Sequence, residues 1–229
     1  MNKTSRSRKT NTGNRSRRWD LVALAVGALV LAVVAAIFLF EGDDPQALQA
    51  EAEARQAALA SEHSPTLGNP GAKVHIVEFL DPACETCALF YPMVKQWMAE
   101  LPGDIRLSVR HIAFHDGADY AVKILEASRN QDKYWQTLEA LLASQNRWVQ
   151  HHTVQPDRIG PVIAGVGLDM EQLEADMYSV EVLQRTEKDM KDSKILKIVA
   201  TPEYFVNGRP LPSFGQQQLA DLVREELQK

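Results

Sequence analysis

Apolar residues along the chain form one long uninterrupted run and then a series of shorter, patterned segments. The run covers residues 21–40, LVALAVGALVLAVVAAIFLF, and contains no charged residue. An apolar run of this length matches the thickness of a bilayer core, so it predicts a single transmembrane helix. The run is longer than the apolar core of a typical signal peptide, and no small-residue cleavage site follows it. We therefore expect an uncleaved anchor.

The charges on either side of this run predict its orientation. Seven basic residues precede it within residues 1–20, whose polar composition is typical of a disordered tail. Glu41, Asp43 and Asp44 follow it. Because the basic side of a span stays in the cytoplasm, we expect a cytoplasmic tail and a C-terminal domain on the other side of the membrane. For a bacterial protein this means a single-pass inner-membrane protein with a periplasmic or extracytoplasmic domain.

The segment after the anchor favours a helix. Residues 43–63 are rich in alanine, glutamate and glutamine, and Pro45 suits the first position of a helix. Apart from several alanines, only Leu48 and Leu59 could form an apolar stripe. We interpret residues 41–65 as a helical spacer, with a weak dimer contact as the alternative.

The next apolar segments predict a strand, a helix and a second strand. Residues 74–80 (VHIVEFL) and 105–114 (IRLSVRHIAF) are rich in β-branched residues, which is typical of strands. Between them an apolar stripe at helical spacing predicts a helix, which Pro102-Gly103 ends. The stripe consists of Leu89, Phe90, Met93, Val94, Trp97, Met98 and Leu101.

The rest of the chain predicts a helical block, a hairpin and a last helix. No strand is apparent between about residues 117 and 198. In residues 203–211, Asn207-Gly208 is typical of a type I′ hairpin turn. Ser213 and Gln216 fit a capping box for a helix that carries Leu219, Leu222, Val223 and Leu227 on one face. This order predicts an α/β fold with one mixed sheet and a helical insertion, in a domain of residues 66–229.

The charge of the chain argues against nucleic-acid binding. The net charge is −5, although residues 1–20 are strongly basic, so the exported domain is more acidic than the total. An acidic domain does not bind a phosphate backbone. The basic tail directly precedes the predicted span, so its charge is explained by membrane topology.

Both cysteines of the chain lie in one tetrapeptide, CETC, after the first predicted strand. Cys84 stands at the predicted start of a helix, where free N–H groups and the helix dipole stabilise a thiolate. Cys87 lies one turn later on the same face, so the two sulfurs can form a disulfide. We expect Cys84 to be the exposed nucleophile and Cys87 the more buried partner.

Three interpretations of this pair remain open. A redox pair suits an exported protein. Half of a metal site would need further ligands, and the chain has six histidines but no second CxxC. A structural disulfide that closes so small a loop would constrain little of the unfolded chain.

Two motifs resemble the DsbA-like branch of the thioredoxin superfamily. Residues 68–87, GNPGAKVHIVEFLDPACETC, resemble the first strand and active site of that family. Residues 200–208, ATPEYFVNG, resemble its Thr-Pro element, and the likeness extends over about residues 66–229. The resemblance implies a thioredoxin-like fold, a mixed sheet flanked by helices with a helical insertion over about 117–198. It also implies a thiol–disulfide oxidoreductase that needs no metal or organic cofactor.

The resemblance also assigns roles to single residues. Pro202 would be a cis-proline facing the cysteines, and the Thr201 backbone would pair with an extended substrate. Glu78 would be a partly buried proton relay for Cys87, with a raised pKa. From the residues alone, Glu78 could equally be a solvated residue at a sheet edge, and Thr201-Pro202 an ordinary trans strand start.

The residues between the cysteines bear on the direction of electron flow. They are Glu85 and Thr86, whereas strongly oxidising members of the family carry Pro-His there. The negative charge of Glu85 should raise the pKa of Cys84 and make a weaker oxidant, unless its side chain points into water.

The sequence therefore predicts disulfide formation in exported proteins through the CETC pair, with a DsbB-like or DsbD-like membrane redox partner. A reductase or isomerase of the same fold is an alternative. An anchored copper carrier that uses the same cysteines is another.

Overall fold

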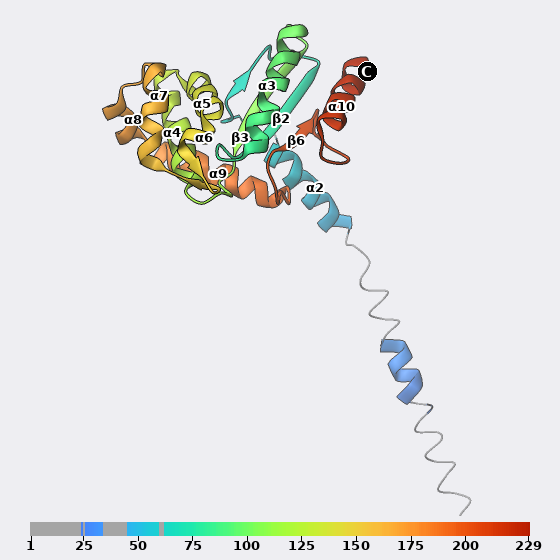
Figure 1. The fold of residues 1–229 in the computed structure, drawn as a ribbon. Coiled ribbons are helices and arrows are strands. Elements are labelled where there is room, and N and C mark those ends of the chain that lie inside the picture. Colours follow the sequence, from blue (N-terminus) through green and yellow to red (C-terminus); the bar gives the residue numbers. More distant parts are fainter. Residues whose placement is uncertain (1–23, 25, 34–44, 60–61) are drawn as a thin grey trace, which may run out of the picture. The chain divides into compact units, whose positions relative to one another are not determined.

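The computed structural model describes residues 24, 26–33, 45–59 and 62–229 (Figure 1). The basic tail and most of the predicted anchor lie outside the described residues. Within the part of the chain that is described, no helix combines the length and the apolar character that crossing a bilayer requires. Residues 26–33, a fragment of the predicted anchor, are helical.

The chain divides into two compact units, Met1–Glu51 and Ala52–Lys229. Helix α2 (Pro45–Leu59) lies in the segment whose composition predicts a helix, and it runs across this boundary. Ala58, near its end, is buried in the core of the second unit. The second unit thus begins before residue 66, because the last turn of the predicted spacer packs as part of the domain.

The second unit is built on a mixed five-stranded sheet in the order β1-β3-β2-β6-β7. Its parallel pair is β2 with β3, and the other neighbours are antiparallel. The strands are β1 (Thr66–Leu67), β2 (Val74–Leu80), β3 (Ile105–His111), β6 (Glu203–Val206) and β7 (Arg209–Pro210). The mixed sheet that the sequence predicts is therefore present, and β2 lies at its centre.

Apolar layers cover both faces of the central strand β2. On one face Ile76 and Leu80 belong to the core formed with α3 (Glu85–Glu100) and α10 (Gln216–Gln228). On the other face Val77 and Phe79 pack with residues of α2 and of the segment after α9. Successive side chains of a strand point to opposite faces, so a strand covered on both sides needs a nearly continuous apolar sequence. This explains the run VHIVEFL.

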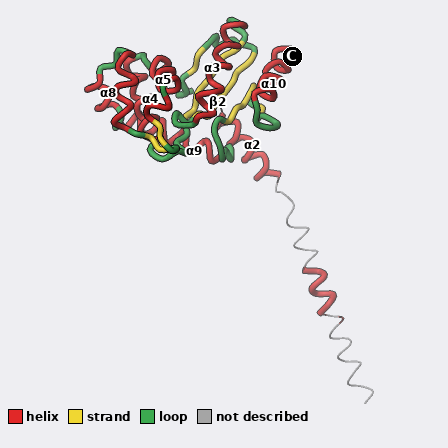
Figure 2. The backbone as a smooth tube through the Cα atoms, viewed as in Figure 1, coloured by secondary structure: helices red, strands yellow, loops and turns green. Residues whose placement is uncertain are grey.

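The helical insertion gathers on one side of the sheet (Figures 1 and 2). Its α-helices are α4 (Ala118–Ser128), α5 (Tyr134–Ala143), α6 (Gln145–Trp148), α7 (Ile159–Ile163), α8 (Met170–Asp176) and α9 (Val180–Ile195). Its short 3-10 helices are η1 (Arg129–Gln131), η2 (Pro156–Arg158) and η3 (Ala164–Val166). The insertion between the two halves of the sheet is thus present as the sequence predicts.

The insertion also contains a hairpin that the sequence analysis missed. Strands β4 (Val149–Gln150) and β5 (Thr153–Val154) pair antiparallel around His151 and His152. Both histidines have positive φ values, 50° and 61°. Histidine gives only a weak turn signal, and two-residue strands are too short to show alternation, so the local sequence did not reveal this turn.

Three local predictions are wrong. β3 ends at His111 rather than at residue 114, because the backbone N–H groups of Phe114 and His115 donate to the Asp81 carboxylate instead of a strand. Leu89 is 63% exposed, since adjacent helix residues point about 100° apart and Phe90 takes the buried position. No side chain caps α10, so Ser213 and Gln216 form no capping box.

The turn and the face of the last helix are as predicted. Asn207 and Gly208 both have positive φ values, 49° and 80°, as a type I′ turn requires. Leu219, Leu222 and Val223 are buried, and Leu227 packs against the same core.

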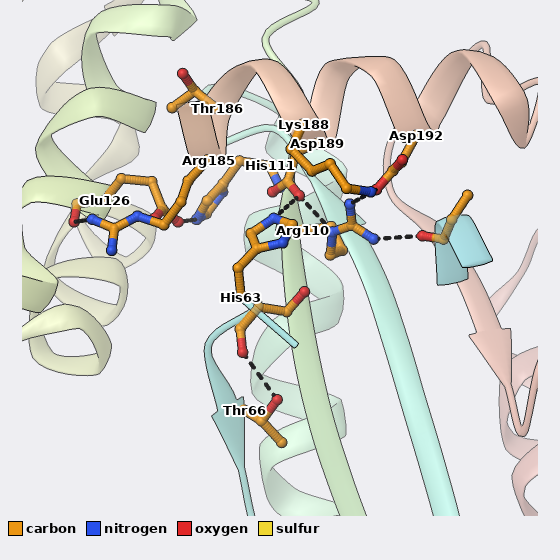
Figure 3. Close-up of polar contacts among 12 residues, drawn as sticks. His63, Thr66, Arg110, His111, Glu126, Arg185, Thr186, Lys188, Asp189 and Asp192 are labelled. Atoms are coloured by element: carbon orange, nitrogen blue, oxygen red, sulfur yellow. Dashed lines mark hydrogen bonds and ion pairs between the residues drawn. The ribbon is translucent and has the colours of Figure 1, made fainter. Parts of the chain in front are cut away.

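A buried charged network ties the sheet to α2 and α9 on the face away from α3. Arg110 of β3 is fully buried and pairs with Asp189 and Asp192 of α9, at 2.5 Å each. Its third nitrogen donates to the Ala58 carbonyl oxygen at 2.7 Å. Figure 3 shows these side chains beneath α9, with His63 Nε2 2.7 Å from Asp189.

Candidate active site

The two cysteines lie at the junction between the central strand and α3. Cys84 is the N-cap residue of α3, with extended backbone angles, and Cys87 lies in the first turn. Both thiols are free, with exposed fractions of 7% for Cys84 and 0% for Cys87. The order of exposure is the predicted one, but Cys84 is covered more than an exposed nucleophile would be.

The surroundings separate the acidities of the two thiols. Hydrogen bonding from the Cys87 side chain is the main cause that lowers the pKa of Cys84 to about 5. Burial opposes this shift, while the backbone N–H groups of Cys87 and Thr86 and the Thr201 side chain add to it. Burial raises the pKa of Cys87 far above its usual range. The pair therefore consists of a ready thiolate and a thiol that holds its proton.

The Thr201–Pro202 peptide bond is cis and stands opposite Cys84. The Cys84 thiol donates to the Thr201 carbonyl oxygen, with a sulfur-to-oxygen distance of 3.3 Å, although the two residues are 117 positions apart. Pro202 is buried directly before β6. The fold thus brings together the two motifs that the sequence singles out.

Glu78 lies on β2 and is fully buried. The Tyr204 hydroxyl donates to Glu78 Oε1 at 2.9 Å, and Oε2 has no hydrogen-bond partner. Burial is the main cause that raises the pKa of Glu78 to about 8; the Tyr204 hydrogen bond lowers it, and the Cys84 charge adds to the increase. A solvated position at a sheet edge is therefore wrong, because β2 is the central strand and α3 covers this face.

The remaining predicted residues lie on α3. Glu85 is exposed in the first turn and Thr86 is half-buried.

Two residues that the sequence analysis missed complete the site. Tyr204 stands opposite Glu78 in the β2–β6 register and supplies its hydrogen bond. Asp81, directly after β2, is fully buried and its carboxylate accepts several hydrogen bonds. Tyr204 could have been noticed two residues after the Thr-Pro motif, but its partner follows only from strand pairing.

No metal cluster accompanies the cysteines in the described part of the chain. There, no three residues among His, Cys, Asp and Glu lie close enough together to hold a metal ion.

Comparison with known proteins identifies the family. The thioredoxin family model matches residues 60–224. Disulfide bond formation protein D of Bacillus subtilis is 25% identical over 173 residues, which cover 72% of this chain and 76% of that protein. The crystal structure of a thioredoxin-like oxidoreductase from Silicibacter pomeroyi is 28% identical, with a TM-score of 0.64, and the match covers 76% of this chain and 98% of that one.

Another relative is the Na(+)/H(+) antiporter NhaA of Herminiimonas arsenicoxydans, 31% identical over 144 residues. The match covers 63% of this chain but only 22% of the antiporter. This chain thus spans about a fifth of the length of that relative, and the similarity does not carry antiport over to it. The chain belongs to the thioredoxin family, and it is similar to an oxidoreductase and to a disulfide bond formation protein.

Proposed function

We propose that this chain is a membrane-anchored periplasmic oxidoreductase that forms disulfides in exported proteins through Cys84 and Cys87. The observation that carries the proposal is the placement of the two thiols: Cys84 is the N-cap of α3 opposite Thr201, and Cys87 is fully buried. These surroundings lower the pKa of Cys84 and raise that of Cys87. A thiolate of low pKa is a good leaving group, so a mixed disulfide between Cys84 and a substrate is readily resolved by a second substrate thiol. A stabilised thiolate also favours the reduced pair, which makes the oxidised pair an oxidant.

The reaction consists of two exchanges of sulfur partners. A substrate thiolate attacks the Cys84 sulfur, the Cys84–Cys87 bond breaks, and its electron pair goes to Cys87. A second substrate thiolate then attacks the substrate sulfur of the mixed disulfide, and Cys84 leaves as a thiolate. The substrate has lost two electrons and gained a disulfide, and the enzyme pair holds these electrons.

Glu78, Thr201 and Pro202 assist these steps. Glu78, with its pKa near 8, gives a proton to the Cys87 sulfur as its bond breaks and takes it back during reoxidation. The backbone beside Thr201 pairs with an extended substrate segment, and Pro202 keeps this edge open opposite Cys84. Glu85 and Thr86 tune the Cys84 thiolate from the first turn of α3.

The N-terminal third holds the domain at the membrane. Residues 1–20 form a cytoplasmic tail and residues 21–40 the anchor, the spacer continues to about residue 51, and the catalytic domain follows from Ala52. A DsbB-like membrane protein reoxidises the pair. Alkaline carbonate washing of membranes tests the anchor: the full chain is expected to stay in the pellet, and its release would contradict a transmembrane helix.

The reduction potential of the full chain in detergent tests the direction of electron flow. Equilibration with glutathione is expected to give a value between about −200 and −120 mV, the oxidising part of the superfamily range. A value near about −270 mV, as in thioredoxin, would contradict disulfide formation and favour a reductase.

Single-cysteine variants test the assignment of the two thiols. Cys84→Ser is expected to abolish oxidation of a reduced test protein. Cys87→Ser, the matched control, is expected to accumulate a mixed disulfide with a disulfide-containing test protein, because the Cys84 thiolate attacks that disulfide, expels one substrate thiolate, and no Cys87 thiol releases the product. Equal trapping by both variants would contradict the assignment.

A further inference from the structure

Asp81 connects the active-site loop to the start of the helical insertion. Its carboxylate is fully buried between β2 and α3. Oδ1 accepts the Ala83 backbone N–H at 2.8 Å. Oδ2 accepts the backbone N–H groups of Phe114 and His115 at 2.8 and 2.9 Å, and His115 Nδ1 lies 2.8 Å from it. Four donors thus surround one carboxylate, and an ionised carboxylate can accept all four because both of its oxygens are acceptors.

The main chain of the same residue touches both cysteines. The Asp81 carbonyl oxygen accepts the Cys84 backbone N–H at 3.0 Å. The Asp81 backbone also hydrogen-bonds the Cys87 sulfur, which favours the Cys87 thiolate. A displacement of Asp81 would therefore move the N-cap of α3 and the sulfur environment together.

The insertion holds the loop of residues 81–83 at further points. Gln145 of α6 donates through Nε2 to the Pro82 carbonyl oxygen at 2.8 Å. The His152 ring of the β4–β5 turn stacks on the His115 ring, with 5.9 Å between centroids. The loop of residues 81–83 is thus hydrogen-bonded to α6 through Gln145 and to the β3–α4 loop through Asp81, and His152 packs against His115 in that loop.

We propose that Asp81 and His115 are positioning residues of the redox pair: by clamping the loop of residues 81–83, they hold the Cys84 sulfur opposite Thr201. This inference rests on the proposed function. Hydrogen bonds weaken steeply with distance and angle, so a loop that shifts by a fraction of an ångström loses part of the stabilisation of the Cys84 thiolate. The helical insertion then serves catalysis directly, through the contact of the β3–α4 loop with the active-site loop.

The Asp81→Asn variant of the full chain tests the inference. The amide group would place a donor against the N–H groups that Oδ2 now accepts, so the loop must move. We expect the pKa of Cys84, followed by thiolate absorbance near 240 nm, to rise by about one unit, which slows alkylation at pH 6 about twofold. Asp169→Asn is the matched control, because Asp169 accepts backbone N–H groups at the start of α8 and contacts neither cysteine. It is expected to leave the pKa of Cys84 unchanged.

His115 variants decide the question even if Asp81→Asn does not fold. His115→Ala removes only the ring contact and keeps both backbone donors, so a smaller rise in the pKa of Cys84 is expected. His115→Gln retains a side-chain N–H and is expected to restore part of the wild-type value. An unchanged pKa of Cys84 in folded His115→Ala overturns the positioning role of His115, and in folded Asp81→Asn that of Asp81.

The two proposals fail in different ways. An ordinary Cys84 pKa in the wild-type protein would contradict the stabilised Cys84 thiolate on which the proposed function relies. A low wild-type pKa that none of these variants changes would contradict the clamp alone.

Discussion

The two faces of the central sheet both bury charged groups, but they treat them in opposite ways. On the face covered by α3, Glu78 has a single hydrogen bond, from Tyr204, and an Oε2 atom without a partner. On the face covered by α9, Arg110 is bound through all three of its nitrogens to Asp189, Asp192 and the Ala58 carbonyl oxygen. The two environments lie close together, because Glu78 and Arg110 belong to successive residue pairs of β2 and β3, Glu78–Val109 and Phe79–Arg110.

Because of this difference, Glu78 is suited to proton transfer, whereas Arg110 and its two aspartates are suited to holding the fold together. Burial raises the pKa of Glu78 to about 8, so its proton is exchangeable near neutral pH. Burial also raises the pKa of Asp189, but the hydrogen bond from His63 and the Arg110 guanidinium more than offset it, so the pKa is lowered overall. A carboxylate locked in its charged form can anchor α9 but cannot relay protons.

Removing the cation of the paired face should give the largest effect. Arg110→Met leaves Asp189 and Asp192 buried without their partner, which is expected to cost about 3–5 kcal/mol in the free energy of unfolding. Urea denaturation measures this loss, and the reduction potential should stay unchanged.

Arg224→Met is the control, because Arg224 pairs with Asp221 on the surface. That change should cost less than about 1 kcal/mol. Equal losses in the two variants would contradict the distinction between the buried network and surface pairs.

Neutralising the unpaired acid should have the opposite effect on stability. Because the folded pKa of Glu78 exceeds its unfolded value, the folded protein keeps a proton that the unfolded chain loses between pH 4.5 and about 8. Wild-type stability therefore falls as the pH rises through this window. Glu78→Gln should be more stable than wild type by roughly 4 kcal/mol at pH 8, with the difference vanishing near pH 4.5.

The same variant should slow the thiol chemistry. Without a proton donor at Cys87, oxidation of a reduced test protein should slow, and its rate should lose the pH dependence near 8. A more stable variant with wild-type rates would show that Glu78 is a buried acid without a role in proton transfer.

Glu85→Gln should have the smallest effect, since its charge lies in water. We expect the pKa of Cys84 to fall by less than about one unit and the reduction potential to become slightly more oxidising. Glu100→Gln, an exposed change at the other end of the same helix, is the control. An unchanged potential in Glu85→Gln would remove the argument that this residue weakens the oxidant.

Much of the fold follows from local signals. The strand 74–80 has the predicted bounds, and Asn207-Gly208 forms the predicted turn. The residue types at neighbouring positions predict such a strand or turn, so a few residues are enough to identify it. The β4–β5 hairpin was missed because two-residue strands and a histidine turn give little local signal. The early end of β3 was missed because a contact with Asp81, distant in sequence, decides it.

The site divides in the same way. The CETC pair and the Thr-Pro motif are visible as short patterns, and their likeness to a known family predicted that they meet. Asp81 carries no such signal, since an aspartate before a proline is typical of any turn. Its role depends on the Phe114–His115 backbone, which the β3–α4 loop brings to it.

The sequence by itself determined the elements, their order and the pair of thiols, because periodicity, turn residues and cysteine spacing act over a few positions. The tertiary structure alone decided which buried charges are paired. Glu78 meets Tyr204 across 126 positions, and Arg110 meets Asp189 across 79. Sheet register and helix docking set these distances, and no local pattern encodes them. The family resemblance singled out Glu78, but only the folded chain shows its full burial and its Tyr204 partner.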